Sequence, residues 1–175
     1  MKSDEAGARA PKRLLIVFGD ITRYQVNARS TPDDDLAALM HEYYLRAGTL
    51  IRASGGRIVK FMGDAFLAVW SEDDAAAGVS ALPTIKRDID AFFAQRGWVS
   101  RLVVKAHVGT AVAGPYGDDG RFDVIGNDVN IAATLPARTI ALSPDAFRLL
   151  APDDRKAWKK HTQQVVYIQV NDPRP

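Results

Sequence analysis

The sequence predicts an α+β fold: a ferredoxin-like βαββαβ antiparallel sheet with helices on one face, followed by a C-terminal α/β extension. Two observations predict this class. Short apolar runs of strand length alternate with two long segments whose apolar residues recur with helical spacing. A Gly-Asp pair at 63–64, between two of the short runs, predicts a tight hairpin. The length of 175 residues suits a single domain.

The first half of the chain predicts a strand, a helix and the hairpin. The apolar run over 14–18 is typical of a strand buried on both faces, and it leads into Gly19-Asp20. Thr31-Pro32 begins an amphipathic helix, which Gly55-Gly56 ends. The runs over 58–62 and 65–70 are the two strands of the hairpin.

The second half predicts another helix, a long strand and the extension. The helix begins at Asp73-Asp74, and Pro83 inside it is expected to kink or break it. A long strand over 101–113 leads through a turn-rich segment to a returning strand over 121–125. The extension consists of a helix over 129–135, a strand over 139–142, a helix over 143–150 and a strand over 165–170.

Composition and charge favour a soluble, cytoplasmic domain. The formal net charge of +2 predicts neither nucleic acid nor a membrane surface as a partner. The chain has no cysteine, which excludes disulfides, thiol nucleophiles and thiolate zinc sites and fits a reducing compartment. No apolar run approaches the roughly 20 residues that span a bilayer. Residues 1–12 are expected to be a disordered arm and 171–175 a tail, which leaves one domain over 13–170.

Two aspartates lie where strands end or turn, which are places where ligands commonly bind. Asp20 follows a buried strand, and Asp64 lies in the hairpin turn, four residues after Lys60. Turn chemistry favours Asn-Gly or Asp-Gly at such a tip, so the Gly-Asp order does not by itself explain the acid. A solvated turn aspartate stays open as the alternative. His107, among apolar neighbours on the long strand, is expected to be a packed core histidine.

Five features in a fixed order carry a resemblance to a known family. They are Asp20 after a buried strand, Lys60 and Asp64 on the hairpin, the segment Ala-His-Val-Gly-Thr-Ala-Val-Ala-Gly over 106–114, and the segment Phe-Asp-Val-Ile-Gly-Asn-Asp-Val-Asn-Ile-Ala-Ala over 122–133. With this order and spacing, the chain over about 13–170 resembles the class III nucleotidyl cyclase catalytic domain, the fold of adenylyl and guanylyl cyclases.

The resemblance implies a metal site and a nucleotide-reading site. Asp20 resembles the first metal carboxylate, with the Ile21 backbone carbonyl beside it, and Asp64 resembles the second. The implied cofactors are two Mg²⁺ or Mn²⁺ ions, which would lower the pKa of the ribose 3′-OH and neutralise the triphosphate.

The same resemblance assigns three residues to the substrate. Lys60 and Asp123 match the pair that reads adenine in adenylyl cyclases, since a lysine donor and an aspartate acceptor suit the N1 and N6 edge of that base. Asn130 matches the asparagine that orients the ribose near the transition state, which makes it both a substrate-binding and a catalytic candidate. The expected substrate is therefore ATP, converted to its 3′,5′-cyclic monophosphate and pyrophosphate.

The family also implies a homodimer. Its protomers pack head to tail and share active sites at their interface. Asp20 and Asp64 would come from one protomer, and Lys60, Asp123 and Asn130 from the other. Lys60 and Asp64 would then serve different sites although they share one hairpin.

The chain departs from the family pattern at three places. Thr134 stands where active members usually carry an arginine one helical turn after the asparagine, and Arg138 is the candidate replacement. Arg23-Tyr24 stand where the family usually has Gly-Phe. The late lysine that contacts the triphosphate has no clear counterpart.

These departures keep two alternatives open. Compact bacterial cyclases of phage-defence systems make cyclic UMP or cyclic CMP, and this chain is similarly short, so a uridylate or cytidylate cyclase of such an anti-phage signalling system is one alternative. A catalytically inactive, nucleotide-binding or dimerisation module is the other. The retention of both Asp20 and Asp64 argues against an inactive module.

Overall fold

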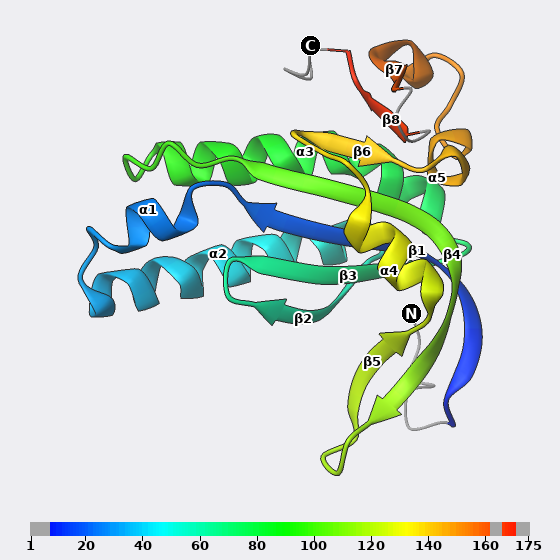
Figure 1. The fold of residues 1–175 in the computed structure, drawn as a ribbon, viewed down its shortest axis with the longest axis horizontal. Helices are drawn as coiled ribbons and strands as arrows, with labels where there is room; N and C mark the ends of the chain where they lie inside the picture. Colours follow the sequence, from blue (N-terminus) through cyan, green and yellow to red (C-terminus); the bar gives the residue numbers. More distant parts are fainter. Residues whose placement is uncertain (1–7, 162–165, 171–175) are drawn as a thin grey trace.

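The computed structural model describes residues 8–161 and 166–170, which form one eight-stranded sheet with helices on both faces (Figure 1). In chain order the elements are β1 (Ala10–Ile21), α1 (Tyr24–Ala28), α2 (Asp33–Ala53), β2 (Arg57–Met62), β3 (Ala65–Ser71), α3 (Ala75–Ala94), β4 (Leu102–Tyr116), β5 (Arg121–Ile125), α4 (Asn127–Thr134), β6 (Ile140–Leu142), α5 (Pro144–Arg148), η1 (Asp154–Ala157), β7 (Trp158–His161) and β8 (Val166–Gln169). The predicted α+β class is confirmed.

The sheet order confirms the ferredoxin-like unit. The strands run β2-β3-β1-β4-β6-β8-β7, and β5 pairs with β4 off this path. The contacts among the first four strands are all antiparallel. In the extension, β6 runs parallel to β4, and β8 and β7 follow antiparallel to their neighbours. The extension therefore lengthens the same sheet.

The two faces of the sheet carry different helices. Helices α2 and α3 cover the larger core, in which Leu15, Val17 and Trp70 of the sheet pack against buried side chains of both helices. Helix α4 covers the opposite face, over a smaller cluster of Leu14, Ile16, Leu67, Val69, Ala111, Ala113, Val124 and Ala132. We call this second side the α4 face. The helices of the ferredoxin-like unit thus share one face as predicted, and the extension places α4 on the other.

Strand β4 is longer than predicted and forms a projecting hairpin with β5. The two strands pair from Val112 with Ile125 to Tyr116 with Arg121. Figure 1 shows this hairpin extending away from the rest of the sheet. We call residues 112–125 the β4–β5 arm.

The predicted disordered segment over 1–12 is wrong at its C-terminal end, because β1 begins at Ala10. Residues 10–12 pair with β4. Strand β3 pairs with β1 only from Leu14 onward. Pro11 has no backbone N–H, and on the β3 side it has no neighbouring strand to which an N–H would donate. The predicted tail over 171–175 lies outside the described residues.

Helix α3 bears on the prediction that Pro83 would kink or break it. It continues from Ala75 to Ala94 with Pro83 inside it, so the proline does not break the helix. No helix in the described part of the chain is both long enough and apolar enough to cross a membrane.

Candidate active site

The first group of candidate residues lies where β1 ends and the β2–β3 hairpin turns. Met62 pairs with Ala65, so Gly63 and Asp64 form a two-residue turn, and Gly63 has the positive φ of 64° that such turns favour. Asp20 is the penultimate residue of β1. Gly19 pairs with Phe66, two residues after Asp64, so the end of β1 and the turn meet at the same edge of the structure.

The carboxylate of Asp20 is close enough to that of Asp64 to perturb the pKa of Asp64. Partial burial raises the pKa of Asp64, and the charge of Asp20 and a side-chain hydrogen bond with it raise it further, against an opposing backbone hydrogen bond. Two like charges that share a site resist joint ionisation. A divalent cation between them would remove that resistance, so this contact fits a metal site.

The donors at this end of the sheet suit Mg²⁺ or Mn²⁺. Both ions prefer oxygen ligands, and Mg²⁺ commonly takes one or two carboxylates together with water and substrate phosphates. Asp20 is exposed and Asp64 half-buried. The Ile21 side chain is a buried hydrocarbon with no donor atom, so only the backbone carbonyl of this residue could serve as a ligand. The described residues contain no group of three or more His, Cys, Asp or Glu that could hold a metal, so the remaining ligands would be water, backbone or substrate oxygens.

Two tyrosines of α2 hold the hairpin turn, a feature that sequence reasoning missed. Tyr44 Oη donates to the Gly63 carbonyl at 2.6 Å, and Tyr43 Oη donates to the Asp64 carbonyl at 3.3 Å. Burial, followed by the charge of Asp64, raises the pKa of Tyr43, so its hydroxyl stays protonated and remains a donor. Helical spacing in the sequence predicts which of the two tyrosines is buried. It does not predict which backbone carbonyls accept hydrogen bonds from the two hydroxyls.

The second group lies where β2 meets the β4–β5 arm. Lys60 Nζ donates to Asp123 Oδ2 at 2.6 Å, and Asp123 Oδ1 accepts a hydrogen bond from the Val124 backbone N–H at 2.8 Å. The register of β2 against β3 shifts between Ile58 and Lys60, and such irregularities re-aim side chains. The Lys60 and Asp123 side chains are 44% and 25% exposed, so the pair presents a cation and an acceptor at the surface.

Asn130 lies beside the second group. It is exposed on α4 and lines a hollow of about 360 Å³ together with Val124 and Ile125, the two residues that follow Asp123 in β5. An amide at this place can both donate and accept hydrogen bonds. The structure thus brings Lys60 and Asp123 into contact and puts Asn130 on the adjoining wall.

Thr134, the last residue of α4, is uncharged. Its hydroxyl donates back to the Asn130 carbonyl at 2.9 Å. The helix ends there because Leu135, which precedes Pro136, takes an extended conformation. Arg138 is exposed in the connection to β6, beyond the helix that carries Asn130.

Asp128 fixes the start of α4 to β4, which sequence reasoning also missed. Its Oδ2 accepts a hydrogen bond from the Thr110 backbone N–H at 2.6 Å. Its Oδ1 lies 3.5 Å from Nε2 of His107, which is only 8% exposed, as a packed histidine should be. A Cβ at Gly109 would lie 2.3 Å from Asp128 Oδ2, so the carboxylate reaches the strand because residue 109 is glycine.

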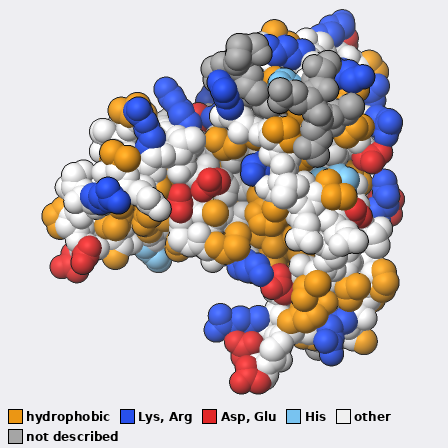
Figure 2. Space-filling view, in the orientation of Figure 1, with side chains coloured by type: hydrophobic (Ala, Val, Ile, Leu, Met, Phe, Trp, Pro, Cys, Tyr) orange, Lys and Arg blue, Asp and Glu red, His pale blue; other side chains and the backbone are white. Residues whose placement is uncertain are grey.

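The surface around these residues is concave and partly apolar. Figure 2 shows a hollow between the main body and the β4–β5 arm, with basic, acidic and hydrophobic side chains around it. Val112 and Ile125, directly opposite each other on the arm, are 37% and 55% exposed, and Ile131 of α4 is 40% exposed. Exposed apolar residues near a candidate site are typical of a surface that another molecule covers.

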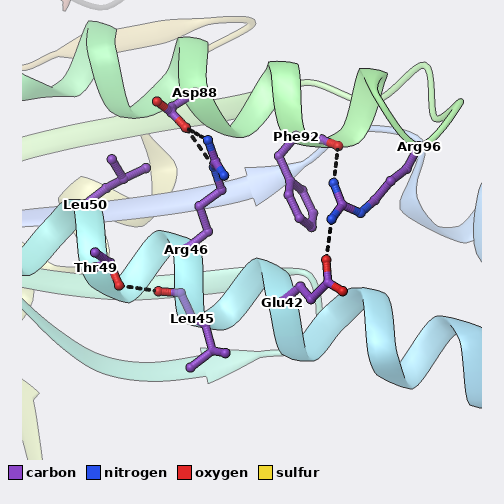
Figure 3. Close-up of a pocket in the computed structure, with 8 residues that line it drawn as sticks. All are labelled: Glu42, Leu45, Arg46, Thr49, Leu50, Asp88, Phe92 and Arg96. Atoms are coloured by element: carbon purple, nitrogen blue, oxygen red, sulfur yellow. Dashed lines mark hydrogen bonds and ion pairs between the residues drawn. The ribbon is translucent and has the colours of Figure 1, made fainter.

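A separate groove lies between α2 and α3, on the side of the sheet away from α4 (Figure 3). Its charged residues pair with each other: Arg46 with Asp88, and Arg96 with Glu42. The Arg96 guanidinium also lies 3.8 Å from the centre of the Phe92 ring. None of the predicted site residues lines this groove, and its internally paired charges join the two helices.

Comparison with known proteins identifies one family. Residues 8–170 match the family described as the adenylate and guanylate cyclase catalytic domain. An adenylate cyclase of Anabaena cylindrica is 27% identical over 145 residues, which are 77% of this chain and 29% of that protein. Adenylate cyclase 1 of Rhizobium meliloti (strain 1021) is 26% identical over 148 residues, 77% of this chain and 22% of that protein. The chain therefore spans less than a third of the length of these curated relatives.

Solved structures share the fold over nearly the whole chain. The adenylyl cyclase CyaB from P. aeruginosa superposes with a TM-score of 0.80 at 20% identity, covering 96% of this chain and 98% of that one. The guanylate cyclase domain of RhGC from Catenaria anguillulae, in complex with GTP, superposes with a TM-score of 0.74 at 20% identity, covering 90% and 95%. At this identity the likeness establishes the fold, and base specificity has to be argued from individual residues.

Proposed function

Because the chain belongs to the adenylate and guanylate cyclase catalytic domain family, we propose that it converts ATP to 3′,5′-cyclic AMP and pyrophosphate in the cytoplasm. One observation carries the catalytic part of this proposal: Asp20 and Asp64, 44 residues apart in the sequence, meet at one end of the sheet, where burial and then the charge of Asp20 raise the pKa of Asp64. A domain that had lost catalysis would not need two converging acids.

The preference for ATP rests on Lys60 and Asp123. Lysine can donate to N1 of adenine, and the aspartate can accept from the N6 amino group. Asp123 Oδ1 is oriented by the Val124 N–H, and Oδ2 keeps an acceptor site besides its bond to Lys60. Guanine reverses the donor and acceptor pattern along the same edge, so it fits this pair less well.

The chain's own residues position the reacting atoms. Lys60 and Asp123 hold the base and Asn130 orients the ribose, so that the 3′ oxygen lies in line with the α-phosphorus. A bond forms between these two atoms as the bond from the α-phosphorus to the bridging oxygen breaks. Pyrophosphate leaves with that electron pair, and the 3′ proton passes to water. Arg138 is the sequence-derived candidate for stabilising the charge that develops.

Asp20, Asp64 and the Ile21 carbonyl would hold two Mg²⁺ or Mn²⁺ ions. When bound, such ions lower the pKa of the 3′-OH and neutralise triphosphate charge. The contact between the two carboxylates supports this assignment.

The active unit in this proposal is a homodimer with two shared sites. One protomer supplies Asp20 and Asp64, and its partner supplies Lys60, Asp123 and Asn130. The exposed apolar residues Val112, Ile125 and Ile131 beside the second group support an interface there.

A direct assay tests the proposal. Purified protein with ATP and Mn²⁺ should release equal amounts of cyclic AMP and pyrophosphate, measured by chromatography. Asp64→Asn should reduce turnover by at least about 100-fold, since it removes a metal carboxylate while keeping the side-chain shape. Asp73→Asn, an exposed carboxylate after β3, is the matched control and should retain activity. Full turnover in Asp64→Asn would refute the two-acid site.

Competition among ATP, GTP, UTP and CTP in one reaction tests the base assignment. We expect ATP to be consumed first. A preference for UTP or CTP would replace the adenine assignment with a pyrimidine cyclase. Binding of triphosphates without any cyclic product would instead indicate an inactive nucleotide-binding module.

A further inference from the structure

Lys105 of β4 is a charged residue near the candidate site that the proposed function does not use. Its Nζ donates to the Ala133 carbonyl at 2.7 Å, in the last turn of α4. The side chain therefore lies on the α4 face, and the lysine is half-buried. A cation at a helix C-terminus is favourable, so this contact also stabilises α4.

The sheet register relates Lys105 to the metal carboxylate. Lys105 pairs with Phe18 of β1, and Asp20 pairs with Val103. Phe18 packs against the cluster on the α4 face. Because side chains alternate along a strand, Asp20, two residues after Phe18, turns to the same face as Phe18 and Lys105. Lys105 thus lies on the same face and at the same end of β1 as the metal carboxylate Asp20, and it also contacts α4.

The charge of Lys105 is not neutralised by an acid. Among the described residues, Lys105 donates to the neutral Ala133 carbonyl and forms no ion pair. Lys60 and Lys86, by contrast, are paired with Asp123 and Asp90. An ammonium group has three donors, so two remain beyond the one that Ala133 receives. A half-buried cation with free donors at a nucleotide site is suited to phosphate oxygens.

We infer that Lys105 is a catalytic residue whose ammonium group binds the triphosphate and stabilises the negative charge of the departing pyrophosphate. This inference rests on the proposed function for its chemistry. It supplies the positive charge that Thr134, with its hydroxyl turned back onto α4, does not. The alternative is that Lys105 only caps the helix.

Substitution separates the two roles. Lys105→Met should lower kcat by about 100-fold and weaken inhibition by Mg²⁺-pyrophosphate by about tenfold or more, whereas Lys105→Arg should keep most of both. Lys12→Met is the matched control, because Lys12 is exposed on β1, eight residues from Asp20. In the Lys105→Met background, Thr134→Lys should restore part of kcat, since in a homodimer it returns a cation to each shared site from the half that carries Asn130. A lower melting temperature with unchanged kcat and pyrophosphate inhibition would leave Lys105 as a helix cap and overturn the inference.

A second measurement needs neither a variant nor turnover. Lysines of the native protein are acetylated with acetic anhydride, and each site is followed by mass spectrometry. Mg²⁺-pyrophosphate should slow modification of Lys105 several-fold and leave Lys12 unaffected, while adenosine should protect neither. Protection of Lys105 in a protein that makes no cyclic nucleotide would refute the proposed function and support the phosphate contact. Cyclic nucleotide formation without protection, and with full turnover in Lys105→Met, would refute the contact alone.

Discussion

Arg23 has a backbone conformation that its side chain disfavours. Its φ and ψ of 59° and 17° are left-handed, and it links the end of β1 to α1, three residues after Asp20. A Cβ in this region costs roughly 1–2 kcal/mol, whereas glycine adopts it freely. The resemblance to the cyclase family already marked this position, because the family usually has glycine there. The structure adds that the arginine keeps the glycine-like conformation.

We therefore expect Arg23→Gly to be more stable than Arg23→Ala by about 1 kcal/mol in the free energy of unfolding. Both variants remove the guanidinium, so lost contacts cancel in the comparison, and only the glycine variant relieves the Cβ strain. Urea denaturation followed by circular dichroism measures the difference as a shift in midpoint at constant slope. Equal midpoints would mean that residue 23 is not held left-handed in solution.

At the scale of elements, the position of α4 depends on a glycine in the neighbouring strand. Gly109 leaves the space in which the Asp128 carboxylate accepts the Thr110 N–H. We expect Gly109→Ala to displace Asp128, to lower the free energy of unfolding by about 1–3 kcal/mol and to reduce turnover about tenfold, because Asn130 lies half a turn further along the same helix. Denaturation and the cyclase assay measure the two effects.

A double-variant cycle supplies the control for Gly109→Ala. Asp128→Ala removes the carboxylate that the new methyl group would meet. In that background Gly109→Ala should lower the free energy of unfolding by at least about 1 kcal/mol less than it does in the native protein, since the two side chains interact directly. Simple addition of the two costs would show that the methyl group meets something other than Asp128.

Periodicity predicted the long elements of this fold because their signals are local. The helical spacing in α2 and the Gly-Asp hairpin are both present as predicted. Of the kink or break expected at Pro83, the break does not occur. An internal proline costs about 3 kcal/mol, whereas α3 buries large side chains such as Leu82, Ile85 and Ile89, each worth about 1.5–3 kcal/mol. Tertiary burial therefore outweighs the proline, and α3 stays continuous.

For the whole molecule, the sequence predicted which residues make up the candidate site better than it predicted the hydrogen bonds that hold the surrounding elements in place. Asp20, Asp64, Lys60 and Asp123 could be chosen because the family motif fixes their order. The supporting contacts depend on packing that no motif encodes: the tyrosine hydroxyls reach carbonyls about 20 residues away in sequence, and Lys105 reaches Ala133. The start of β1 at Ala10 was missed for the same reason, since its partner strand lies about 100 residues later.

The shared sites of the proposed dimer lead to a test in which two inactive proteins restore activity. Asp64→Asn disables the metal half of a site, and Asn130→Ala disables the ribose half. When equal amounts are refolded together, half of the dimers are mixed, and each mixed dimer holds one site with both halves intact, so activity should reach about a quarter of the native value. Cyclic nucleotide released per mole of protein measures the recovery.

The pairing of variants decides how recovery is interpreted. Asp64→Asn mixed with Asp20→Asn should stay inactive, because both changes fall in the metal half and every site in a mixed dimer then lacks one of its acids. Recovery only with the Asn130→Ala partner would support sites that span two protomers. If neither mixture exceeds the activity of its components, one chain must supply both halves, and the exposed apolar residues of the β4–β5 arm would need another partner to cover them.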